Sequence, residues 1–131
     1  MIIDAALVLK QTDGNETLAT SATTGVTSDY IDFGTENWQG TGRPLTLLFN
    51  VVSNTASGGT DFTFTIEDCD TANGTYATIA TRTITLAALT VGTQWEMLVP
   101  FNTRRYVRFK ITPVGTGMTG ALGVKAALVN K

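Results

Sequence analysis

The chain has 131 residues, of which 43% are apolar and only 15% are charged, whereas charged residues make up about 25% of an average domain. The net charge of −2 argues against a nucleic-acid-binding protein, which would carry a basic surface. The sequence contains no apolar run of about 18 residues that would span a membrane. The length fits a single domain over residues 1–131, and the 25 threonines favour strands.

The N-terminal segment and the single cysteine bear on where the protein is made. The first residues, MIIDAALVLKQ, lack the basic segment and the small-residue cleavage site of a secretory signal. Cys69 has no second cysteine with which to form an internal disulfide. Both features predict synthesis in a reducing cytoplasm, where the fold is stabilised by packing and not by a disulfide.

The N-terminal third of the chain alternates strands with long connections. Apolar residues at every second position predict a strand over residues 2–10. A long polar stretch follows over 12–29 and is expected to lie against the body of the protein. A second strand is predicted over 28–33, and the Gly-rich loop over 34–43 carries Trp38.

Three strands are predicted in the middle of the chain. The strand over 44–53 is the most apolar and is partly apolar on both faces, which predicts a central position in its sheet. The strand over 60–68 alternates regularly, with its aromatic residues inside. In the strand over 75–86 the alternation changes phase, which predicts a bulge near residues 81–82. Residues 87–93 are expected to form a connection or a short helical turn.

A β-hairpin is predicted next, from strands over 94–101 and 106–112. Apolar side chains occupy alternate positions in both strands, so both rows face one core if the turn contains the three residues 102–104. This register places Glu96 opposite Lys110, as a favourable cross-strand ion pair.

A closing strand over 121–129 brings the number of predicted strands to eight, separated by Gly, Asn and Asp turns. About eight antiparallel strands in a chain of this length predict an all-β fold, a two-sheet antiparallel sandwich. The jelly roll is the commonest eight-stranded version and is the expected topology. An immunoglobulin-like sandwich is the main rival, although it usually has seven strands in about 100 residues.

Residues that carry catalytic chemistry are scarce. The chain has no histidine, which removes Ser-His-Asp and Cys-His arrangements and the commonest metal ligand. Cys69 has no candidate base. The turn with Asp68, Asp70 and Asn73 is acidic, but Ala72 takes a ligand position of the calcium loop and no Glu closes it. The sequence therefore predicts no catalytic residue, cofactor or metal ion, although an unmarked pair of glycosidase carboxylates stays open.

Two surface features are candidate interfaces. The outward row of the predicted hairpin consists of Arg104, Tyr106, Arg108 and Lys110. This row is either a solvated sheet face, in which Glu96 neutralises Lys110, or a docking patch. Trp38 is either a lid packed on the core or an interface anchor.

Three stretches carry a family resemblance. They are IIDAALVLKQTDGNETLATSATTGVTSDYIDFG, EDCDTANGTYATI, and MLVPFNTRRYVRFKIT with the Gly-rich turn and closing strand that follow it. In order and spacing they resemble the Bbp16-type capsid cement proteins of tailed bacteriophages. This resemblance implies a jelly-roll domain that forms a homo-oligomer, a dimer or a trimer, outside an icosahedral capsid. There it would bridge copies of the major capsid protein, and the resemblance marks no individual binding residues.

Together with the lack of catalytic groups, the resemblance implies a structural virion protein that is not an enzyme. The net charge and the lack of a long apolar run predict no nucleic-acid or membrane partner. The protein would be made in the host cytoplasm and would lie on the capsid exterior. The main alternative is a carbohydrate-binding β-sandwich module on the virion surface, with Trp38 or Tyr30 as a stacking platform. Trp95 is not a candidate for this platform, because it alternates in phase with the core residues of its strand. A small hydrolase is the third and weakest alternative.

Overall fold

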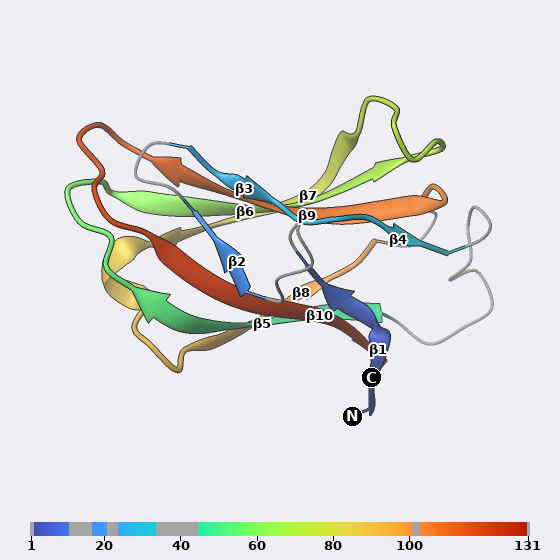
Figure 1. Cartoon of the computed structure of the whole chain (residues 1–131), viewed down its shortest axis with the longest axis horizontal. Helices are drawn as coiled ribbons and strands as arrows, with labels where there is room; N and C mark the ends of the chain where they lie inside the picture. Colours follow the sequence, from blue (N-terminus) through green and yellow to red (C-terminus); the bar gives the residue numbers. More distant parts are fainter. Residues whose placement is uncertain (1, 11–16, 21–23, 34–44, 101–102, 131) are drawn as a thin grey trace.

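The computed structural model describes residues 2–10, 17–20, 24–33, 45–100 and 103–130. Two antiparallel sheets pack face to face and enclose one hydrophobic core (Figure 1). The predicted fold class, an all-β two-sheet sandwich, is confirmed. In the part of the chain that the structure describes, no helix has the length and apolarity needed to cross a membrane.

Each sheet contains four strand positions. The first sheet has the order β1 (Ile2–Leu9), β10 (Leu122–Asn130), β5 (Leu45–Asn54) and β8 (Gln94–Leu98), with β2 (Thr17–Ala19) also on β10. The second sheet has the order β3 (Val26–Thr27), β9 (Tyr106–Val114), β6 (Asp61–Cys69) and β7 (Ala77–Thr85), with β4 (Ile31–Asp32) also on β9. A short 3₁₀ helix, η1 (Leu86–Ala88), follows β7, as expected for the connection after it.

The strand orders define a jelly roll. The segments β1 and β2 pair with successive parts of β10, and β3 and β4 pair with successive parts of β9, so each pair acts as one interrupted strand. Renumbered in this way, the sheets have the orders 1-8-3-6 and 2-7-4-5. These are the two interleaved Greek keys of the jelly roll, and they place β5 centrally, as predicted.

The predicted β-hairpin is wrong. The strand β8 pairs with β5 in the first sheet, whereas β9 pairs with β6 in the second sheet, so the chain crosses between sheets after β8. Glu96 consequently lies opposite Leu48 and not opposite Lys110. Met97 and Phe109 are both buried, as expected. Alternation predicts which side of a strand is buried, but it does not predict the strand's partner. Two strands of one sheet and two strands of facing sheets can both bury their apolar rows in the same core.

Two local predictions are corrected by the register. The bulge in β7 is present but lies at Ile79, because Ile66 faces Ala80 while Glu67 faces Thr78. The polar stretch over 12–29 contributes the short strands β2 and β3, which are too short to show a periodicity.

The centre of the core is a stack of three phenylalanines. The ring of Phe49 on β5 lies 4.7 Å from the ring of Phe64 on β6, and Phe109 on β9 lies 5.9 Å from both. All three side chains are fully buried. Offset ring pairs of this kind contribute packing energy beyond the burial of their area, so this stack fixes how the two sheets sit on one another.

Candidate functional site

Aromatic and charged side chains gather on the outer face of the second sheet, near the start of β9. We call Tyr30, Tyr76, Tyr106, Arg105 and Arg108 the tyrosine–arginine cluster; it contains all three tyrosines of the chain. The rings of Tyr30 and Tyr106 meet edge to face at 5.1 Å. The guanidinium of Arg105 lies 5.1 Å from the Tyr106 ring, and that of Arg108 lies 3.9 Å from the Tyr76 ring.

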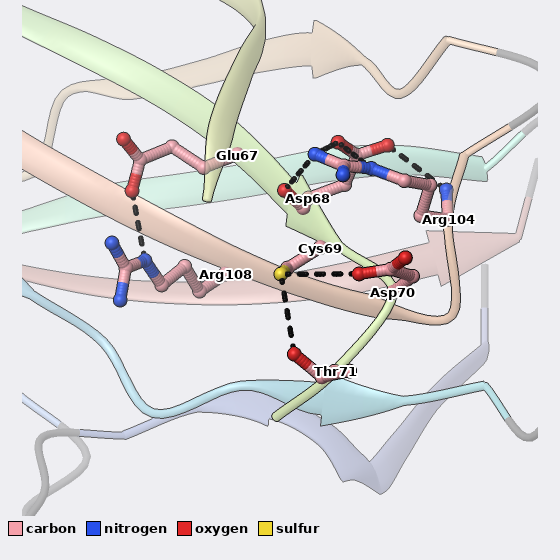
Figure 2. A network of polar contacts seen from close by, with 7 residues as sticks. All are labelled: Glu67, Asp68, Cys69, Asp70, Thr71, Arg104 and Arg108. Carbon is pink, nitrogen blue, oxygen red and sulfur yellow. Dashed lines mark hydrogen bonds and ion pairs between the residues drawn. The ribbon is translucent and has the colours of Figure 1, made fainter. Parts of the chain in front are cut away.

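Arg108 is held in place from two sides. Its Nε donates a hydrogen bond of 2.8 Å to Oε1 of Glu67, which lies directly opposite it on β6 (Figure 2). Its guanidinium also stacks on Tyr76, a favourable cation–π contact. Glu67 is buried although its strand position points outward. The terminal nitrogens of Arg108 make no hydrogen bond to any residue that the structure describes.

Tyr76 follows the turn between β6 and β7. Its hydroxyl donates a hydrogen bond of 3.0 Å to the carbonyl of Ala72, which closes the turn over Cys69. Burial raises the pKa of Tyr76 above its ordinary value, and the charge of Arg108 opposes this shift. The phenol is therefore neutral at neutral pH, so it acts as a hydrogen-bond donor and a packing surface.

The second predicted strand, over 28–33, is interrupted by a bulge. Thr27 faces Lys110 and Ile31 faces Val107, so four steps along the chain match three steps along β9. The amide of Asp29, inside the bulge, donates to the carbonyl of Lys10 and not to β9. Bulges commonly occur beside functional sites, where they redirect side chains.

A polar pocket of about 280 Å³ lies beside this bulge. Its walls come from residues 27–30 and from the turn after β6, with Ala72, Asn73 and Tyr76. Arg108 of β9 also lines it. The pocket therefore combines a cation, an aromatic wall and backbone segments that are brought together only by the tertiary fold.

Arg104 does not belong to the outward row, contrary to the prediction. Its Nε donates to Oδ1 of Asp68 at 3.0 Å, its Nη2 donates to the Asp68 carbonyl at 2.7 Å, and its backbone amide donates to Oδ2 at 2.9 Å (Figure 2). The hydrogen bond to Asp68 raises the pKa of Arg104. Arg104 precedes the first residue of β9, so strand alternation does not fix its direction.

The predicted acidic turn does not form a cation site. The carboxylate of Asp68 is buried and bound to Arg104. The carboxylate of Asp70 instead lies 3.7 Å from the buried thiol of Cys69, which also contacts the Thr71 hydroxyl at 3.8 Å (Figure 2). The two carboxylates thus face different partners and do not converge on a common point. Among the described residues no group of three acidic, Cys or His side chains is placed to hold a metal ion.

The remaining interface predictions have mixed outcomes. Tyr106 and Arg108 lie in the cluster, while Lys110 lies further along β9, opposite Thr65, and makes no ion pair with a described residue. Its predicted partner Glu96 is in the other sheet. Trp38 lies outside the described residues.

Sequence reasoning missed three members of the surrounding network. Arg105 forms a bidentate pair with Asp32, at 2.7 and 2.9 Å, and Tyr76 packs under Arg108. Arg105 falls on an inward position of the alternation, and Tyr76 lies in the predicted strand over 75–86, where the alternation changes phase, so neither was marked by periodicity. The signal that was present is compositional, because two adjacent arginines, Arg104 and Arg105, directly precede Tyr106.

Comparison with known proteins bears on the whole chain. A comparison with curated proteins found no match. The model of the Bbp16 family matches residues 15–128, a span that begins before β2 and ends within β10. This span includes all described strands except β1 and the end of β10, and it includes the whole tyrosine–arginine cluster. The chain therefore belongs to the Bbp16 family.

Proposed function

We propose that this protein is a capsid cement protein. In this proposal a homo-oligomer binds the outside of an icosahedral phage head and bridges neighbouring major capsid protein subunits. The observation that carries the proposal is membership of the Bbp16 family over residues 15–128, together with the resemblance of the chain to Bbp16-type cement proteins. The virion exterior is then its place of action, and the host cytoplasm is its place of synthesis.

The fold and the cluster are compatible with this role. A cement protein has to hold a fixed shape between two shell subunits, and the jelly roll provides two sheets locked on one aromatic core. Tyrosine and arginine are the side chains that most often dominate binding energy at protein interfaces. Arg105 and Tyr106, the members of the tyrosine–arginine cluster that do not line the pocket, present both beside the start of β9 and support a contact surface there.

Cementing is a binding effect that follows mass action. A protein that binds the assembled shell more tightly than free subunits stabilises the shell by a free energy that grows with the logarithm of its concentration over its dissociation constant. One small domain buries roughly 800 Å² of its own surface in a contact of standard size. Within an oligomer, the second subunit binds its site at a high effective concentration, so the oligomer stabilises the shell more steeply than the same number of monomers.

The test compares shells with and without the protein. Shells are either assembled without the protein or stripped of it. The temperature at which they release DNA is then measured before and after the purified protein is added back. We expect the protein to co-sediment with shells and to raise the release temperature. Shells that are equally stable in both cases, with the protein left in the supernatant, would reject the proposal. A control protein of similar size and charge, added at the same concentration, reports non-specific effects.

A further inference from the structure

We propose that the pocket beside the bulge binds a neutral saccharide through one sugar ring. The pocket lies between residues 27–30 and the turn after β6, with Arg108 in its lining. This ligand is separate from the major capsid protein, so the inference does not depend on capsid attachment.

The bulge creates the space for a ligand. An unbroken strand over residues 27–31 would place side chains in regular register beside β9. The extra residue instead carries Asp29 and Tyr30 away from the ladder, and the Asp29 amide bonds to Lys10. The Ser28 hydroxyl accepts a hydrogen bond of 2.8 Å from the Phe109 amide and thereby ties the bulge to β9. The opening is thus a fixed part of the sheet.

Arg108 provides preorganised hydrogen-bond donors. Glu67 holds its Nε and Tyr76 holds its plane, and both terminal nitrogens remain without a hydrogen bond to any described residue. A planar guanidinium with a fixed orientation presents two parallel donors, a geometry that fits a pair of neighbouring hydroxyl oxygens. Since its orientation is already fixed, little side-chain entropy is lost on binding.

Asp29 and Tyr30, which also line the pocket, provide an acceptor and an apolar surface. The Asp29 carboxylate accepts the Tyr30 amide through Oδ1 at 3.2 Å, and its Oδ2 makes no hydrogen bond to a described residue. Tyr30 lines the pocket, is 42% exposed, and is braced by the edge-to-face contact with Tyr106. An aromatic ring with a polar tip suits a ligand that has both C–H and O–H groups.

The charge of the pocket points to a neutral ligand. Its lining contains one cation, Arg108, and one anion, Asp29, and Glu67 already neutralises the cation. A carboxylate or phosphate ligand would therefore meet a net negative site, and a cation would meet the guanidinium. A polyol uses both the donors and the acceptor without burying an unpaired charge. The volume of about 280 Å³ lies just below the range of drug-sized pockets, and this small size suits one sugar ring.

The experiment is an NMR titration of the ¹⁵N-labelled protein. The probes are the methyl glycosides of glucose, galactose, mannose and N-acetylglucosamine, with N-acetylneuraminic acid as an anionic comparison. We expect at least one neutral glycoside to shift the amides of residues 27–30 and 72–76 and the Arg108 Nε signal. A dissociation constant of the order of 1 mM is expected for a single ring at one shallow site.

Three variants locate the site. Tyr30→Ala and Arg108→Lys should each weaken binding about tenfold or more, since the first removes the aromatic wall and the second the planar pair of donors. Tyr106→Phe, which lies beside the pocket and keeps its ring, should bind like the original protein. Amide spectra of each free variant check that the fold is retained.

Each other result overturns the inference. Absence of shifts with all four neutral glycosides, shifts confined to other parts of the surface, or binding of N-acetylneuraminic acid only would reject a neutral saccharide site. Undiminished binding by the folded Tyr30→Ala and Arg108→Lys variants would place the ligand elsewhere. Because these measurements use the isolated protein, their failure leaves the shell-binding test unaffected, and the reverse also holds.

Discussion

Arg104 ties the crossing between the two sheets to the end of β6 by holding the buried carboxylate of Asp68. Three hydrogen bonds join the two residues, two from the Arg104 side chain and one from its backbone amide. Asp68 occupies an inward position of β6, opposite Val107. An unpaired carboxylate at such a position would be costly, so Arg104 is part of the architecture and is not available for docking.

Replacing Arg104 with alanine should lower the free energy of unfolding by about 3 kcal/mol. This is the low end of the cost of breaking a buried ion pair, because the Arg104 side chain is itself 34% exposed while that of Asp68 is 5% exposed. Urea denaturation followed by tryptophan fluorescence measures the effect.

The neighbouring arginine supplies a matched control. Arg105→Ala also removes a bidentate pair, with Asp32, but those side chains are 44% and 37% exposed. Exposed pairs contribute little to stability because solvent screens them, so this variant should remain close to the original stability. Equal losses for the two variants would contradict the structural role of Arg104.

Truncation of the central phenylalanine should destabilise the fold strongly. Phe64 contacts both Phe49 and Phe109, and a buried Phe→Ala substitution costs about 3–5 kcal/mol. Phe64→Leu should cost less because it leaves a smaller cavity. Val91→Ala, at a side chain that is 65% exposed, is the control and should be near neutral. A soluble Phe64→Ala variant with unchanged melting temperature would refute the assignment of the stack as the core.

Stability should fall at high pH through Tyr76. Burial raises the pKa of its phenol in the folded state above the ordinary value of 10.0. Below pH 10.0 the phenol is protonated in both states, and its full contribution is present. Above that pH the unfolded state ionises first, so the contribution is lost as the pH rises through the folded pKa.

A comparison with Tyr76→Phe isolates this effect. The phenylalanine keeps the ring under Arg108 but loses the hydrogen bond to Ala72, which lowers stability by about 1 kcal/mol at neutral pH. The difference between the two proteins should shrink above pH 10.0, as measured by denaturation over a pH series. A difference that grows with pH would have the wrong sign for a raised pKa.

Binding to shells should depend only weakly on salt. Three arginines near the start of β9 are paired within the protein, with Asp68, Asp32 and Glu67, so little net charge is left to meet a partner. Between about 0.01 M and about 0.15 M salt the Debye length falls from about 30 Å to about 8 Å, and we expect less than a roughly twofold change in affinity.

Lys110 is the cation of the predicted row without a described ion pair. Lys110→Ala should therefore remove any salt dependence that remains, while Lys125→Ala, on the other sheet, should not. A tenfold loss of co-sedimentation over the same salt range, retained in Lys110→Ala, would show that the internal pairs open to contact the shell.

The sequence by itself determined the strands and their buried faces. The apolar rows of β5, β6, β9 and β10 are buried as their alternation predicts, and the strands missed among the described residues are two or three residues long. Alternation is a local property, because adjacent side chains of a strand point to opposite faces whatever the strand pairs with. The number of strands and the commonest eight-stranded topology then led to the jelly roll.

Only the tertiary structure decided the partners. The same alternation is compatible with β8 and β9 in one sheet or in facing sheets, and the fold chose facing sheets. The tyrosine–arginine cluster joins residues as far apart in the chain as Tyr30, Tyr76 and Tyr106. Arg104 binds Asp68 and does not lie in the predicted surface row, because a buried carboxylate must be paired. Such choices depend on contacts between distant segments, which form only when both sheets close on the core.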